Sequence, residues 1–407
     1  MRWKLCGLVL LVWAGSAEAG PDDLPREVLL LAHFKQQMRQ VLSQVPNYTC
    51  LETIQRSARG AHASAFTSLD TVLLEISNLE NKELLAWPGA HRFEDGDLTS
   101  FASGGLMGSG VFASFAQDVF LGATTTIRYY GGEEIAGRAL TRFDFRIPEV
   151  WSGFRLKANG ASAKVGTMGS FWMDPDSMEL VRLSIRADDI PPAVGIERTA
   201  TVIDYARMRI GETDVLLPQD AKMLLMLISG EIRQNDIAFS HCHEYRTESS
   251  IRFDMPDTSE PVSAPPVRLV DLPAGLLVSV ELETAIDSGT AHVGDLLRGH
   301  VINDVGLKGK AIIVPKGALV TGRIRGLERL RSPEPAFEVT IELAELEWEN
   351  ARSEFYGELL RNPMVAGAPR TPGTGVFHMK GTQFHIAAGF QMNWRTLEPN
   401  QRLRKSK

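Results

Sequence analysis

The histidine and cysteine residues near position 242 are the first candidates for chemistry, because both types bind metals. His241-Cys242-His243 places three such side chains in a row. In an extended strand the two histidines share one face while Cys242 points to the other, so a metal site would need further ligands. His243-Glu244 also begins a zincin pattern, but Thr247 occupies the position of its second histidine. We therefore predict no metal-binding residues.

A glycine-rich stretch, Gly108-Ser109-Gly110-Val111-Phe112-Ala113, has the form of a dinucleotide-binding loop. That fold needs a strand before the loop and an acidic residue about twenty positions after it, and neither is evident. Ser109 also lacks the glycines, two positions away on each side, of a nucleophile elbow. We therefore predict no catalytic residue and no cofactor. We interpret the chain as non-enzymatic, with a secreted hydrolase as the less favoured alternative.

The N-terminal sequence predicts export. Basic residues precede an apolar stretch over residues 5–13, and the small-x-small pattern Ala17-Glu18-Ala19 stands before Gly20. This is the pattern of a secretory signal peptide over residues 1–19. A membrane anchor is the alternative, but the apolar stretch has about ten residues whereas a span needs about twenty. No later segment approaches that length, so we expect a periplasmic or secreted protein without a transmembrane span.

Two of the three cysteines, Cys50 and Cys242, remain once the signal peptide is removed. Two thiols in an exported protein are a candidate disulfide, and only one intramolecular pairing exists. Two separately buried free thiols are the alternative. We predict the bond, because the first and last strands of a sheet that curls around a helix can approach each other.

The composition describes a folded protein with a mild acidic excess. The 407 residues are 44% hydrophobic and include 43 Lys and Arg against 50 Asp and Glu, for a net charge of −7. A general nucleic-acid-binding protein would carry a basic surplus, so this class of partner is excluded. At roughly 150 residues per domain the length favours two domains.

The periodicity of the apolar residues predicts a long helix followed by many strands. One apolar stripe at helical spacing ends before Pro46 and comprises Leu31, Phe34, Met38, Val41 and Val45. Segments typical of strands follow at residues 72–76, 126–130, 140–145, 169–174, 180–185, 199–205 and 242–253. We therefore predict a mainly β domain over residues 20–254, an antiparallel half-barrel wrapped on one long N-terminal helix.

A second, short helix interrupts this strand pattern. The apolar side chains of residues 111–121 follow helical spacing, directly after a glycine-rich segment at 104–110. A glycine-hinged apolar helix of this kind fits a lid over a concave apolar face. An ordinary core helix is the equally favoured alternative. The residues predicted to contact an apolar ligand are Leu106, Met107, Val111, Phe112 and Phe115.

Prolines mark a boundary in the second half of the chain, where five of the 21 prolines lie between residues 256 and 273. We predict a semi-stiff linker over residues 255–271. After the linker, apolar residues again alternate with polar ones, as in strands. This pattern predicts a second, smaller β-barrel domain over residues 272–396. Residues 397–407 form a basic tail.

Two hairpin segments carry a resemblance to a known family. They are Phe171-Trp172-Met173-Asp174-Pro175-Asp176 and Leu180-Val181-Arg182-Leu183. With the preceding long helix and strand meander, they make residues 24–254 similar to the lipoprotein-carrier fold of the LolA/LolB type. That fold is an open half-barrel wrapped on a helix. The resemblance implies a concave apolar cavity able to hold acyl chains.

Three further motifs carry a second resemblance. They are Leu272-Pro273-Ala274-Gly275, Ala291-His292-Val293-Gly294-Asp295, and Val314-Pro315-Lys316-Gly317-Ala318 followed by Thr321-Gly322-Arg323-Ile324. Their glycines and prolines set tight turns at strand ends. With them, residues 272–396 resemble the β-barrel domain of conjugation and type IV secretion outer-membrane complex proteins. This resemblance implies a barrel module within the cell envelope.

These features predict a non-enzymatic exported protein. Its first domain is expected to bind a lipid, a lipoprotein acyl chain or an apolar partner segment. Its barrel is expected to be an interaction module for an envelope protein. The alternative is a sensor of envelope stress that binds a membrane protein partner instead of moving cargo.

Overall fold

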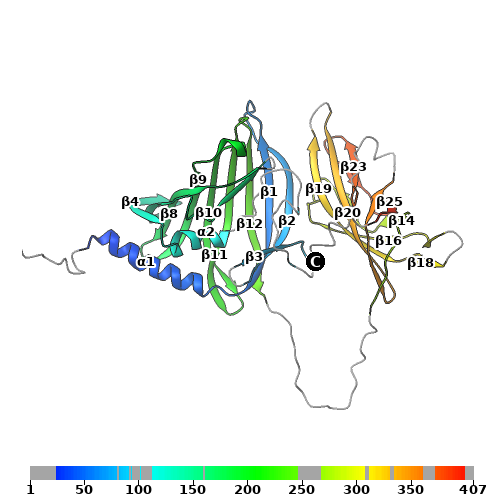
Figure 1. The fold of residues 1–407 in the computed structure, drawn as a ribbon, viewed down its shortest axis with the longest axis horizontal. Coiled ribbons are helices and arrows are strands. Elements are labelled where there is room, and N and C mark those ends of the chain that lie inside the picture. Colours follow the sequence, from blue (N-terminus) through cyan, green and yellow to red (C-terminus); the bar gives the residue numbers. More distant parts are fainter. Residues whose placement is uncertain are drawn as a thin grey trace, which may run out of the picture.

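Among the residues that it describes, the computed structural model contains two large β-sheets, three two-stranded sheets and two α-helices (Figure 1). It describes residues 24–79, 82–90, 93, 101, 112–158, 161–245, 267–307, 311–330, 334–360 and 372–398. The predicted signal peptide lies outside these residues, as does the predicted linker up to residue 266. The signal peptide, the linker and the domain boundaries stay predictions.

Helix α1 (Arg26–Ser43) is the predicted N-terminal helix. Pro25 precedes it, and the fixed φ of proline suits the first turn of a helix. The apolar stripe is confirmed, because Phe34 and Met38 are buried and Leu31 packs against the core. Neither described helix has both the length and the apolar character needed to cross a membrane.

The first sheet has ten antiparallel strands in the order β3-β2-β1-β12-β11-β10-β9-β8-β5-β4. Their bounds are β1 Tyr48–Arg59, β2 Thr67–Leu79, β3 Lys82–Ala86, β4 Thr126–Ile135, β5 Arg138–Ile147, β8 Gly166–Asp174, β9 Glu179–Asp188, β10 Ile196–Ile210, β11 Thr213–Leu227 and β12 Ile232–Glu244. A small hairpin, β6 (Arg155–Ala158) and β7 (Ala161–Lys164), and a short 3-10 helix, η3 (Pro192–Val194), lie outside this ladder. The predicted mainly β half-barrel on one long helix is confirmed.

One face of this sheet is apolar and carries the helices. Cross-strand register places Tyr129, Phe143, Phe171, Leu183, Ile203, Ala221, Ile237, Ile54 and Val72 in a single row across nine strands. The ring of Phe34 on α1 stacks on Phe171, with the ring centroids 5.4 Å apart. Helix α1 therefore covers the face that carries this row, which we call the inner face.

Some strands of the first sheet differ from the sequence prediction, β12 and β11 among them. Strand β12 begins at Ile232 and ends at Glu244, so it starts ten residues before the predicted segment; residues 246–253 of that prediction lie outside the described residues. Strand β11 has no counterpart in the sequence prediction, because Pro218 and the polar residues after it break the alternation. The sheet accommodates them through a register shift opposite Asp204 and Tyr205.

The second sheet has nine strands that curl into the predicted smaller barrel. Their bounds are β13 Arg268–Leu269, β14 Leu277–Leu282, β16 Leu296–Val301, β19 Leu319–Leu330, β20 Ala336–Trp348, β21 Ala351–Glu354, β22 Gly357–Leu359, β23 Gly375–Lys380 and β25 Gln391–Thr396. The short strands β15 (Ile286–Asp287) with β24 (His385–Ile386), and β17 (Val305–Gly306) with β18 (Ile312–Val314), form two further pairs. The amide of Gly373 donates to the carbonyl of Gly357 at 3.0 Å, which brings the start of β23 to β22.

The two sheets touch at one edge of β2. Strand β3 pairs with residues 75–79 of β2 only, so the preceding part of that edge is open to another partner. Val293 forms a parallel bridge to Val72 there: the Leu73 amide donates to the Val293 carbonyl at 2.8 Å, and the Val293 amide donates to the Thr71 carbonyl at 2.8 Å. A segment of the second half of the chain thus extends the first sheet.

Gly294 allows this close approach, and its replacement by alanine is expected to weaken the contact. Gly294 has a φ of +105°, and a Cβ atom there would lie 2.5 Å from the Leu73 carbonyl oxygen and 2.9 Å from the Trp87 ring. The backbone strain alone should cost about 1–3 kcal/mol. Urea unfolding followed by tryptophan fluorescence measures the loss. Gly289→Ala is the matched control, because a Cβ at Gly289 meets nothing within 4 Å; equal midpoints for the two variants would refute the prediction.

Candidate functional site

The predicted apolar lid lies partly outside the described residues. Leu106, Met107 and Val111 are not among them, and Phe112 is described only as the first residue of helix α2 (Phe112–Leu121). The side chain of Phe115, the fifth predicted residue, is buried. The predicted helix is thus present, and the motion of a lid stays a prediction.

Helix α2 packs on the inner face through aromatic side chains. Phe120 is fully buried, and its ring meets those of Phe34 and Phe171 edge-to-face at centroid distances of 5.4 and 5.0 Å. Phe171 also stacks on Phe143, with the centroids 5.2 Å apart. Such pairs add stabilisation beyond the area that they bury. Both helices therefore meet the sheet at one aromatic group, formed by Phe34, Phe120, Phe143 and Phe171.

A buried carboxyl group interrupts the apolar inner face at β1. Glu52 is 0% exposed and stands between Leu74 on β2 and Phe239 on β12. No described residue makes a hydrogen bond to either carboxylate oxygen. Burial, and secondly the charge of Glu83, raise the pKa of Glu52 to about 8. Glu52 is therefore mostly protonated at neutral pH.

Two tyrosines of this sheet have enclosed side chains: Tyr48 is buried, and Tyr205 is half-buried with its hydroxyl enclosed. Tyr48 is on β1 and Tyr205 is on β10, and the hydroxyl of Tyr205 has no hydrogen-bond partner among the described residues. Burial raises the pKa of Tyr48, and Glu83 raises it further. Burial also raises the pKa of Tyr205, with smaller contributions from Tyr48 and Glu83. Both hydroxyls therefore stay protonated at physiological pH.

An ion pair occupies the next positions of the inner face. Arg56 on β1 and Asp70 on β2 are opposite each other, and their side chains are 4% and 6% exposed. The guanidinium of Arg56 donates from Nε to Oδ1 at 2.6 Å and from Nη2 to Oδ2 at 2.5 Å. This two-point geometry compensates both charges. The pair therefore contributes to the structure of the sheet and offers no free charge to a ligand.

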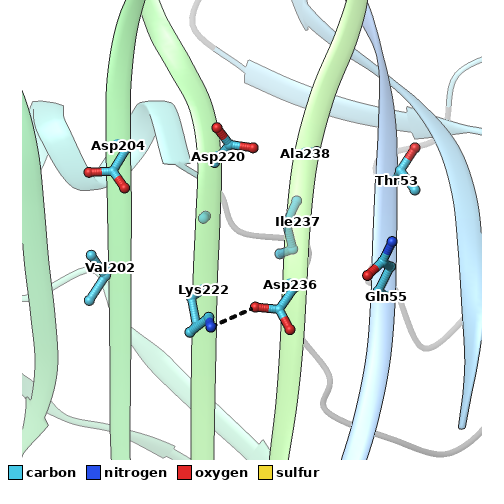
Figure 2. Close-up of a pocket in the computed structure, with 10 residues that line it drawn as sticks. Thr53, Gln55, Val202, Asp204, Asp220, Lys222, Asp236, Ile237 and Ala238 are labelled. Atoms are coloured by element: carbon cyan, nitrogen blue, oxygen red, sulfur yellow. Dashed lines mark ion pairs between the residues drawn. The ribbon is translucent and has the colours of Figure 1, made fainter. Parts of the chain in front are cut away.

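An open hollow of about 280 Å³ lies across β1, β12, β11 and β10, where the acidic and basic side chains of the opposite, outer face gather (Figure 2). Lys222 Nζ lies 3.1 Å from Asp236 Oδ1. Arg182 donates to both carboxylate oxygens of Asp204, at 2.6 and 3.0 Å. Asp220 also lines the hollow. The charged side chains that line this hollow are thus Asp204, Asp220, Lys222 and Asp236.

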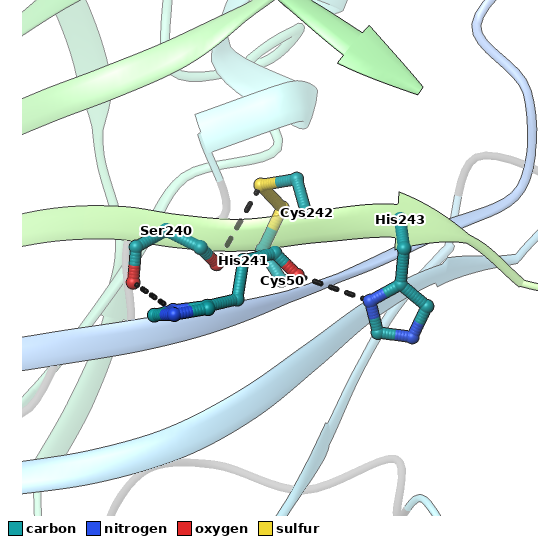
Figure 3. The surroundings of a disulfide bond; sticks show 5 residues. All are labelled: Cys50, Ser240, His241, Cys242 and His243. Atoms are coloured by element: carbon teal, nitrogen blue, oxygen red, sulfur yellow. Dashed lines mark hydrogen bonds between the residues drawn. A yellow bond between two sulfur atoms is a disulfide. The ribbon is translucent and has the colours of Figure 1, made fainter. Parts of the chain in front are cut away.

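The predicted disulfide between Cys50 and Cys242 is confirmed (Figure 3). It joins β1 to β12, with the Cα atoms 4.1 Å apart, beside a register shift at which His241 has a φ of +51°. His241 Nδ1 lies 3.1 Å from Ser240 Oγ, and His243 Nδ1 lies 3.0 Å from the His241 carbonyl oxygen. In the part of the chain that the structure describes, no three His, Cys, Asp or Glu side chains gather in a way that could hold a metal ion.

The stability of the protein should fall between pH 5 and pH 8 because of Glu52. Its pKa of about 8 in the folded state lies above the ordinary value of 4.5. A group with a raised folded-state pKa contributes its full stability below the unfolded pKa and loses that contribution as the pH rises through the folded pKa. The loss should reach up to about 3 kcal/mol.

Glu52→Gln is expected to abolish this loss, because an amide does not ionise. Urea denaturation of both proteins at pH 5 and pH 8 tests this. The variant should gain stability relative to the parent as the pH rises. A pH-independent difference between the two proteins would contradict the assignment to Glu52.

The comparisons with solved structures cover about half of this chain. No protein-family model and no curated protein sequence matches the chain. Similar solved structures include a DUF1329 family protein from Desulfovibrio piger, at 12% identity over 53% of this chain and 92% of that chain, with a TM-score of 0.28.

Two further similar structures bear lipoprotein-sorting names. A LolA superfamily protein from Nitrosomonas europaea is 9% identical over 53% of this chain and 94% of that chain, with a TM-score of 0.27. A domain from Vibrio parahaemolyticus, described as an outer membrane lipoprotein-sorting protein, is 8% identical over 54% of this chain and 93% of that chain, with a TM-score of 0.26. These sequence identities and TM-scores are too low to transfer a function from those proteins to this chain. None of these descriptions supports the resemblance of residues 272–396 to a secretion-complex barrel.

Sequence reasoning did not single out the buried carboxyl group, although a signal for it exists. Glu52 follows Cys50 and precedes Ile54 at two-residue spacing, and all three are buried. A charged residue in the apolar phase of a strand is the pattern that indicates a buried ionisable group. Tyr205 on β10 is separated from β1 by more than 140 residues of chain, and strands β12 and β11 lie between β1 and β10 in the sheet.

Proposed function

We propose that the protein is a non-enzymatic exported carrier whose first sheet, together with α1 and α2, binds a lipid acyl chain, a lipoprotein acyl chain or an apolar segment of a partner. The packing of α2 carries this proposal. Phe115, Val119 and Phe120 are buried where this helix meets the sheet and α1. An apolar chain on the inner face would make the same kind of contact when α2 moves away.

The size of α2 makes this exchange energetically plausible. The helix has ten residues, and isolated helices shorter than about 12–15 residues are marginal in water. Helix α2 is therefore stabilised chiefly by its contacts with the inner face. Full burial of a phenylalanine side chain contributes about 1.5–3 kcal/mol. A ligand of comparable apolar area can offset the loss of these contacts.

Phe115→Ala tests the proposal directly. If α2 yields to a ligand, the variant should lose less stability than the about 3–5 kcal/mol of a fixed core phenylalanine. It should also bind a fluorescent fatty acid several-fold more weakly than the parent, because Phe115 would contact the ligand. Fluorescence titration and urea denaturation give the two values.

Phe377→Ala in the second sheet is the matched control for Phe115→Ala. Phe377 is 1% exposed on β23, so its replacement should destabilise fully and leave probe binding unchanged. A parent protein that binds no probe, together with a loss for Phe115→Ala as large as that for Phe377→Ala, would rule out both the lid and the binding face.

We assign the second sheet the role of a docking module for an envelope protein. The bridge between Val72 and Val293 supports this assignment, because it couples the second sheet to the first. Mass spectrometry of organic extracts of the mature protein separates the carrier from the sensor. Bound lipid that exchanges with added vesicles supports a carrier, and a stably bound membrane protein without lipid supports a sensor.

A further inference from the structure

The turn between β5 and β6, at residues 148–153, exposes two adjacent apolar side chains. Val150 is 73% exposed and Trp151 is 64% exposed. Exposed apolar groups that gather on a surface mark contact sites. Tryptophan in particular is enriched where proteins meet one another or the boundary of a membrane. This pair of side chains therefore indicates a surface that meets a partner.

Hydrogen bonds hold the turn in a fixed shape. The amides of Trp151 and Ser152 both donate to the Pro148 carbonyl at 3.0 Å, and Ser152 is 3% exposed. Lys164 on β7 donates from Nζ to the Val150 carbonyl at 2.9 Å. The apolar pair is thus presented in one arrangement, so binding does not first have to order the turn.

Two basic side chains flank the turn on the hairpin of β6 and β7. Arg155 and Lys164 are opposite each other in register. Leu156, the next residue of β6, packs into a small apolar cluster, so Arg155 and Lys164 lie on the other side of the hairpin. Neither of them forms an ion pair with a described residue. Against the one exposed carboxylate of the turn, Glu149, they leave an excess of positive charge.

This combination suits a membrane surface better than a protein. A specific protein interface buries about 800 Å² on each partner, which is more than two side chains at a turn provide. A bilayer needs no surface of matching shape. Tryptophan rings lie at its headgroup level, and basic residues are attracted to its surface when the lipids are anionic.

We propose that the turn at Val150 and Trp151, with Arg155 and Lys164 beside it, docks the protein on the surface of an anionic lipid bilayer. Val150 and Trp151 enter the headgroup region. Arg155 and Lys164 lie at its surface and donate hydrogen bonds to the lipid phosphates.

The turn lies directly beside helix α2. The ring of Phe154, which follows the turn, meets that of Phe115 on α2 at a centroid distance of 5.6 Å. A Cβ atom at Gly153 would lie 3.3 Å from Oδ2 of Asp118, also on α2. A bilayer held at Trp151 therefore lies next to the helix that yields to the ligand. This link to α2 rests on the proposed function, whereas the docking does not.

Flotation of the full mature chain with lipid vesicles tests the docking. The protein should bind vesicles of equal parts phosphatidylcholine and phosphatidylglycerol about tenfold or more tightly than vesicles of phosphatidylcholine alone, because each basic residue contributes about fivefold near an anionic surface. Added salt should remove this preference. The emission of Trp151 should shift to shorter wavelength on binding, and the difference between the parent and Trp151→Phe isolates that signal.

Two variants with matched controls identify the residues that dock. Trp151→Ser should weaken binding to the anionic vesicles about tenfold or more and leave the urea midpoint unchanged. Leu277→Ser is its control, because Leu277 on β14 is 63% exposed and lies in the second sheet. Arg155→Gln should lower the affinity for anionic vesicles alone by about fivefold. Arg298→Gln, at an exposed arginine of β16, should change neither affinity.

The outcomes separate the docking from the proposed function. Binding of a fluorescent fatty acid without vesicles should be the same for the parent and Trp151→Ser. A parent that binds no anionic vesicles, or a Trp151→Ser variant that binds them as the parent does, overturns the docking and leaves the carrier standing. The second of these results would assign the exposed pair to a protein partner. A parent that docks on vesicles but binds no fatty acid keeps the docking and overturns the carrier.

Discussion

Replacement of both Cys50 and Cys242 by alanine is expected to lower the free energy of unfolding by up to about 5 kcal/mol. The two cysteines are separated by 192 residues, yet they join adjacent strands. A crosslink over so long a loop removes much conformational entropy from the unfolded chain. Without it, β1 and β12 must find each other across the whole meander.

Urea denaturation of the parent and the double alanine variant measures this loss. The parent treated with a reductant is the matched control, because it loses the bond without a change of sequence. Reduced parent and variant should have similar stabilities, both well below that of the oxidised parent. A difference below about 1 kcal/mol between oxidised parent and variant would mean that the unfolded chain gains little freedom from the loss of the bond.

The second large loss of stability is expected when the buried ion pair of Arg56 and Asp70 is broken. Asp70→Ala leaves the guanidinium of Arg56 buried without its carboxylate, and the loss of one partner of such a pair costs about 3–5 kcal/mol. The side chains are 4% and 6% exposed, so water does not replace the missing partner readily. Urea denaturation at pH 7 measures the cost.

Two controls identify the cause of that loss. Arg56→Met combined with Asp70→Leu removes both charges and should recover most of the stability lost in Asp70→Ala, because an apolar pair needs no compensation. Asp214→Ala breaks the pair of Arg209 with Asp214, which are 61% and 58% exposed, and should cost less than about 1 kcal/mol. If the double variant is as unstable as Asp70→Ala, the loss comes from packing and not from an unpaired charge.

Local patterns in the sequence were sufficient to predict the elements that depend on neighbouring residues. Helix α1 follows from its apolar stripe, and the hairpin of β8 and β9 follows from alternation around Pro175-Asp176. The disulfide follows from the number of cysteines in an exported chain. Each of these conclusions needs only a short window of sequence or a count.

Features set by distant register could not be predicted in this way. The bridge between Val72 and Val293 joins residues more than 200 positions apart, and neither position shows a local signal for it. Strand β11 was missed because Pro218 breaks the alternation, while the pairing with β10 absorbs the irregularity. The burial of Glu52 similarly depends on which strands flank β1. Such features depend on the pairing of the whole sheet and not on the residues beside them.

The bridge at Val293 also bears on how the protein avoids self-association. Unpaired strand edges are templates for intermolecular sheet growth, and growth into fibres requires an open edge at both ends of a sheet. Among the described residues, one end of the first sheet has only the five-residue strand β3 and the part of β2 that Val293 covers. The long edge strand at the other end, β4, contains a bulge between Tyr129 and Gly131. If two molecules paired through their β4 edges, neither would present another long open edge. Association of this kind would therefore end at a dimer.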